Sequence, residues 1–135
     1  MKKVIVIDGQ KFTDLEGFFC LMDEILRADD CTTAFGHNLD AFNDLLGGGF
    51  GVHDVGEPIV VKWINYGESR KALGYEETAR YYRDKLDRTM FKDNYVLRRR
   101  LEQALERKGR TLLDMITGII REDETGHDCE LIIEE

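Results

Sequence analysis

Apolar residues along the chain fall into short runs, and three of these runs have the character of strands. Residues 3–7 (KVIVI) are largely β-branched and show no polar alternation, which predicts a strand covered on both faces. Residues 59–64 have the same character, follow Pro58 and contain the only tryptophan, Trp63. Residues 130–134 (ELIIE) predict a third strand at the C-terminal end of the chain.

Apolar residues between these runs recur at helical spacing. A first helix is predicted over residues 13–27, where Thr13 and Glu16 have the spacing of a capping box. A second is predicted over residues 39–46, with Asn38 as its N-cap. Four glycines among residues 47–51 end this second helix, because glycine gives up too much backbone entropy to remain helical.

The C-terminal half contains further helical patterns. Residues 75–86 have mixed periodicity, residues 96–105 form a clearer helix that Gly109 can close, and residues 112–120 carry another apolar stripe. Strands separated by helices pair in parallel through right-handed crossovers. A chain of 135 residues is the size of one domain. We therefore expect a single small α/β domain over residues 1–135.

Composition and charge narrow the function classes. No apolar stretch is long enough to span a membrane, and the N-terminus lacks the long apolar region of a signal peptide. A cytoplasmic location is therefore expected. The three cysteines, Cys20, Cys31 and Cys129, contain no CxxC pair, and we expect reduced thiols.

The net charge is −8 but unevenly spread. Residues 68–110 contain 13 Lys/Arg and 8 Asp/Glu, so a basic segment is inserted into a strongly acidic body. Such a body repels nucleic acid and attracts basic proteins.

The predicted second helix carries the most distinctive chemistry. Its apolar residues share one face, whereas Asp40 and Asp44 point outward together on the other. Like charges at this spacing destabilise a helix by about 0.2–0.5 kcal/mol, and neither has a Lys or Arg one turn away. The pair can serve to receive a cationic partner, or it can be an ordinary solvated acidic face.

Enzymatic interpretations have little support. His37, His53 and His127 lack metal-ligand spacing, and no Ser or Cys lies in a nucleophile-elbow context. Exposed aspartates also lack the desolvation that separates the pKa values of an acid/base pair. We expect neither enzymatic activity nor a cofactor or metal.

The run around this helix contains Phe35, Gly36, Asn38, Leu39, Asp40, Ala41, Phe42, Asp44 and Leu46. In these residues the chain resembles the signature of the barstar family of intracellular ribonuclease inhibitors. With the strands and the last helix, the resemblance covers about 90 residues. It implies a three-stranded parallel sheet packed with helices, whose second helix and preceding loop plug the active site of a basic ribonuclease, as an immunity protein for a toxin does.

The resemblance also implies which residues contact the ribonuclease. These residues are Phe35, His37, Asn38, Asp40, Asn43, Asp44, Phe50 and Glu122. Asp44 is the more important of the two helix aspartates, and Asp123 or Glu124 can take the place of Glu122 as the third acidic contact.

Three aromatic positions of the family differ in this chain. The family's tyrosine before the motif falls at Ala34 or Phe35, its helix tryptophan is Asn43, and its following aromatic is Gly49 or Phe50. Because such aromatics carry much of an interface's energy, the cognate enzyme can differ from that of other members.

The inserted segment, residues 75–110, has three interpretations. It can be a helical pair packed on the acidic body, a second contact surface or dimer interface, or a nucleic-acid site at Arg98, Arg99 and Arg100. Three consecutive arginines point in three directions on a helix, which disfavours the last. A monomer is expected, with a dimer through the insertion as the alternative. The alternative function is a regulatory or scaffold module for a basic partner.

Overall fold

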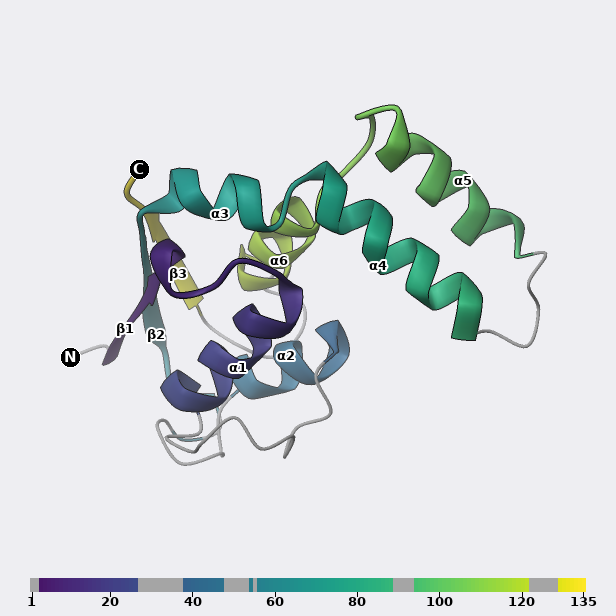
Figure 1. Ribbon diagram of the computed structural model, residues 1–135. Coiled ribbons are helices and arrows are strands. Elements are labelled where there is room, and N and C mark those ends of the chain that lie inside the picture. The colour runs from purple at the N-terminus through teal and green to yellow at the C-terminus, as the bar shows by residue number, and fades with distance from the viewer. Residues whose placement is uncertain (1–2, 27–37, 48–53, 55, 89–93, 122–128) are drawn as a thin grey trace.

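A three-stranded parallel sheet forms one side of the molecule (Figure 1). The computed structural model describes residues 3–26, 38–47, 54, 56–88, 94–121 and 129–135. Strands β1 (Lys3–Asp8), β2 (Ile59–Ile64) and β3 (Cys129–Ile133) lie in that order, with Ile5 opposite Val61 and Val61 opposite Leu131. The three predicted strands and the α/β fold class are confirmed.

One face of the sheet is exposed at both edge strands, so the prediction that the first strand is covered on both faces is wrong. Ile5 and Ile7 are buried, but Val4 and Val6 are 59% and 45% exposed, and Ile132 of β3 is 42% exposed. The strand order explains this difference. Two successive right-handed crossovers in the order β1-β2-β3 place their helices on the same side of the sheet.

The core lies between the covered face and the helices α1 (Leu15–Leu26), α2 (Leu39–Leu46) and α6 (Leu112–Arg121). Trp63 of β2 stacks on Phe18 of α1, with ring centroids 5.8 Å apart and an interplanar angle of 9°. Phe42 of α2 meets Phe18 edge-on at 5.3 Å. All three rings are fully buried, so the aromatic cluster of Trp63, Phe18 and Phe42 joins α2 to the sheet.

Two short elements were not predicted, the 3-10 turn η1 (Gly9–Lys11) and the helix α3 (Tyr66–Ala72). Helix α3 follows Asn65, whose φ of 51° is left-handed, and it buries only one side of a short, charged sequence. Its Ser69 accepts a hydrogen bond from the buried Trp63 Nε1 at 2.8 Å. The backbone of Gly9 packs closely against the start of α3. A Cβ atom at Gly9 would lie 2.2 Å from the Asn65 carbonyl oxygen.

The N-terminus of α1 differs in detail from the predicted capping box. The helix begins at Leu15, and the Asp14 side chain, rather than that of Thr13, accepts from the Gly17 N–H at 2.7 Å. The Leu15 N–H donates to Glu77 Oε2 at 2.7 Å. A carboxylate from a distant segment thus accepts a hydrogen bond from a backbone N–H at the helix end that has no partner within the helix.

The basic segment forms two adjacent helices, α4 (Tyr75–Arg88) and α5 (Tyr95–Leu105), which we call the arm. The arm extends away from the sheet in Figure 1. It leaves and rejoins the body at one place, where the Leu113 N–H donates to the Leu73 carbonyl at 3.1 Å. Thr78 Oγ1 accepts from the Leu112 N–H there at 2.9 Å.

The cysteines do not all remain thiols. Cys20 of α1 is disulfide-bonded, whereas Cys129 of β3 does not take part in a disulfide. The prediction of three reduced cysteines is therefore wrong at Cys20. Cys31 lies outside the described residues. Within the described part of the chain, no helix has both the length and the apolar composition needed to cross a membrane.

The buried contact between Trp63 and Ser69 should be important for stability. We expect Ser69→Ala to lower the free energy of unfolding by about 1–3 kcal/mol, because the indole N–H loses its acceptor in a site without water access. Urea unfolding followed by circular dichroism measures this loss. In a Trp63→Phe background the same change should cost clearly less, and an equal cost in both backgrounds would contradict the assignment.

Candidate protein-binding site on helix α2

Helix α2 is held by its own caps and by the aromatic cluster. The Asn38 side chain accepts from the Ala41 N–H at 2.7 Å, as the predicted N-cap should. The Gly47 N–H donates to the Asp44 carbonyl at 3.1 Å where the helix ends. The predicted bounds of this helix and its N-cap are confirmed.

The two faces of α2 differ sharply. Phe42, Leu45 and Leu46 are buried against the core, whereas Asp40 and Asp44 are exposed. Among the described residues neither aspartate forms an ion pair. Two carboxylates that have no ion-pair partner in the described part of the chain thus lie on one exposed side of the helix. Asp40, in the first turn, is also favoured by the helix dipole.

The remaining predicted contact residues divide into two groups. Asn43 is half-buried on α2, and its Oδ1 atom is buried without a hydrogen-bond partner in the described part of the chain. Asn38 is exposed at the start of the helix. The other predicted contacts lie outside the described residues, namely Phe35, His37, Phe50 and Glu122.

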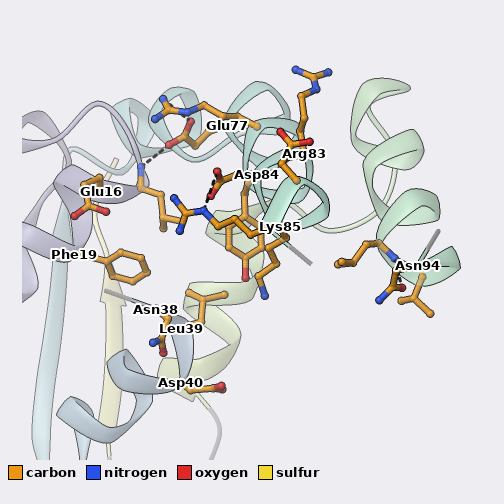
Figure 2. Close-up of a pocket in the computed structure, with 17 residues that line it drawn as sticks. Glu16, Phe19, Asn38, Leu39, Asp40, Glu77, Arg83, Asp84, Lys85 and Asn94 are labelled. Atoms are coloured by element: carbon orange, nitrogen blue, oxygen red, sulfur yellow. Dashed lines mark hydrogen bonds and ion pairs between the residues drawn. The ribbon is translucent and has the colours of Figure 1, made fainter. Parts of the chain in front are cut away.

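A cleft of about 1190 Å³ lies beside the start of α2, between α1 and the arm (Figure 2). Leu39 and Asp40 line it from α2, and Phe19 lines it from α1. The arm contributes charges of both signs. Arg88 pairs with Asp84 at 3.3 Å.

A second hollow of about 610 Å³ lies between α2 and α6. Asp40 borders both hollows, and Arg110 and Arg121 line the second. Neither hollow could be predicted from the sequence, because the walls of each come from segments far apart along the chain. Within the described residues, no three His, Cys, Asp or Glu side chains are grouped to hold a metal ion.

Comparison with known families agrees with this geometry. The family model described as Barstar (barnase inhibitor) matches residues 2–93, which is more than half of the chain. The protein therefore belongs to the barstar family. The match includes the sheet strands β1 and β2, helix α2 and helix α4 of the arm, and it ends before α5. No curated protein matches the chain.

The N-cap of α2 provides a test of how this helix is positioned. We expect Asn38→Ala to lower the free energy of unfolding by about 1 kcal/mol, because the Ala41 N–H loses its acceptor. Asn38→Ser keeps an oxygen in this position and should retain most of the stability. Thermal unfolding of the two variants measures the difference, and equal losses would show that the cap is not the reason.

Proposed function

We propose that the protein inhibits a basic ribonuclease by covering its active site with α2, and that it acts as an immunity protein in the cytoplasm. One observation carries the proposal. Asp40 and Asp44, which belong to the barstar-like motif, are exposed together on a helix whose other face is buried in the core. The helix therefore presents two carboxylates at a fixed spacing, and neither forms an ion pair with any residue that the structure describes.

Inhibition follows from the chemistry of the substrate. A ribonuclease binds RNA phosphates through Arg, Lys or His side chains, and charge-assisted hydrogen bonds to carboxylates can replace those contacts. Asp40 and Asp44 would occupy the phosphate positions, with Glu122 as the third acidic contact. The residues around them, Phe35, His37, Asn38, Asn43 and Phe50, would complete the contact surface. The mechanism needs no cofactor and no catalytic step by this chain.

The direct experiment is to capture the partner with the native chain. We expect mass spectrometry of the captured material to identify a small basic ribonuclease, and addition of the chain to abolish its RNA cleavage. A captured basic protein without nuclease activity would instead support a regulatory or scaffold role.

Asp44 should contribute more to binding than Asp40. In the barnase–barstar complex of this family, close charge pairs have coupling energies of about 1.5–7 kcal/mol. We expect Asp44→Ala to weaken binding by at least about tenfold, and Asp40→Ala by less, in calorimetric titration of the captured ribonuclease. Both variants should fold normally, since each loses a like-charge neighbour. Unchanged affinity in both variants would return the pair to an ordinary solvated face.

Salt should act mainly on the encounter of the two proteins. Between roughly 0.05 and 0.5 M salt we expect association to slow markedly and dissociation to change much less, because charge steering is screened over a Debye length of about 4–14 Å. Stopped-flow mixing measures both rates. Association that does not respond to salt in this range would argue against an acidic binding helix.

A further inference from the structure

The hollow between α2 and α6 brings two arginines next to the acidic helix. Arg110 and Arg121 are exposed, and neither forms an ion pair with any described residue. Asp40 lines the same hollow and is likewise unpaired within the described chain. Charges of both signs therefore border one small hollow, and among the described residues they form no ion pair with one another.

One of these arginines, Arg110, packs against helix α6. The Arg110 side chain lies along α6, where its Nη2 donates to the Asp114 carbonyl at 3.2 Å. A Cβ at Gly118 would lie 2.8 Å from the same Nη2 atom. Glycine is less favourable than alanine inside a helix. The glycine at position 118 therefore leaves room for the Arg110 guanidinium group against the helix.

The sign of these charges conflicts with a partner that is uniformly basic. Arg110 and Arg121 line the same hollow as Asp40, so their positive charges would repel a basic protein seated on α2. The conflict is resolved if the partner presents an acidic group at this place. A guanidinium is suited to this role because its planar fork can donate two parallel hydrogen bonds to one carboxylate.

We propose that Arg110 and Arg121 are specificity residues that receive a carboxylate of the bound ribonuclease, while Asp40 takes a neighbouring basic group. This inference rests on the proposed function. It selects ribonucleases that carry an acidic side chain beside the basic phosphate-binding groups. A phosphate of RNA is the less suitable occupant, because Asp40 borders the hollow and the chain carries a net charge of −8.

Charge reversal of the two arginines should weaken binding if the ribonuclease presents an acidic group at the hollow, and should strengthen binding if the ribonuclease is uniformly basic there. With the captured ribonuclease as the probe, we expect Arg110→Glu and Arg121→Glu each to weaken binding by about tenfold or more. Arg99→Glu on α5 is the matched control, since Arg99 is exposed on the arm and does not line the hollow. It should change affinity by less than about threefold. Unchanged or tighter binding by the two hollow variants would overturn the inference.

Gly118→Ala separates this role from a structural one. The added methyl group should displace the flexible end of Arg110, so thermal stability is kept or raised while affinity for the ribonuclease falls. In an Arg110→Ala background the same change should have no further effect on affinity. An equal loss in both backgrounds, or a loss of stability that accounts for the weaker binding, would count against the positioning of Arg110.

A charge swap identifies the partner group. If Asp or Glu residues of the ribonuclease are changed to Lys one at a time, one such variant should bind the wild-type chain poorly and recover affinity with Arg110→Glu. Failure of every swap to recover affinity would overturn the pairing. So would binding of a labelled single-stranded RNA that is lost in the two Arg→Glu variants while ribonuclease binding persists.

Asp44→Ala distinguishes this inference from the function on which it rests. If Asp44→Ala weakens binding and the arginine reversals do not, only the inference fails. If neither Asp44→Ala nor Asp40→Ala has an effect, the proposed function fails and the inference fails with it.

Discussion

The stacking of Trp63 on Phe18, with Phe42 against the edge of Phe18, determines where the acidic helix lies. These three rings come from β2, α1 and α2, and all are fully buried. A helix of eight residues is too short to be stable alone in water. Its direction is therefore imposed by Phe42 and its caps. The packing of Phe42 on the opposite side of the helix therefore also fixes where Asp40 and Asp44 lie.

In helix α2, different positions serve stability and binding. The buried positions of α2 supply the packing, and the exposed positions supply charge that has no internal partner in the described chain. A carboxylate already paired within the protein would have to break that pair before meeting a partner. The unpaired aspartates avoid this cost, at the expense of a small mutual repulsion in the free protein.

Local patterns predicted the elements that depend on neighbouring residues. The bounds of α2, its Asn38 cap and the strand of residues 59–64 all follow from short-range spacing and from residues that end helices. The predictions failed where tertiary structure decides. A β-branched run has the same pattern whether one or both faces are covered, and the exposure of Val4 and Val6 follows from the order of the strands.

The candidate site shows the same division. The motif was sufficient to place Asp40 and Asp44, because both lie on one helix. The hollow with Arg110 and Arg121 could not be predicted, since it depends on how α6 packs beside α2 and on the space left by Gly118. The capping of α1 depends on a similar long-range contact, the hydrogen bond from the Leu15 N–H to Glu77.

The hydrogen bond between Leu113 and Leu73 has a consequence for how the chain can be altered. The two ends of the arm meet there, so the arm behaves as a long loop closed at its base. Closing a longer or shorter loop between fixed ends changes the entropy only slowly with length. The part of the arm that lies beyond Glu77, Thr78, Tyr81 and Tyr82, which contact the body, can therefore be lengthened, shortened or exchanged for another folded unit without moving the sheet. The part of the arm away from this base is therefore a suitable place for inserting a reporter domain.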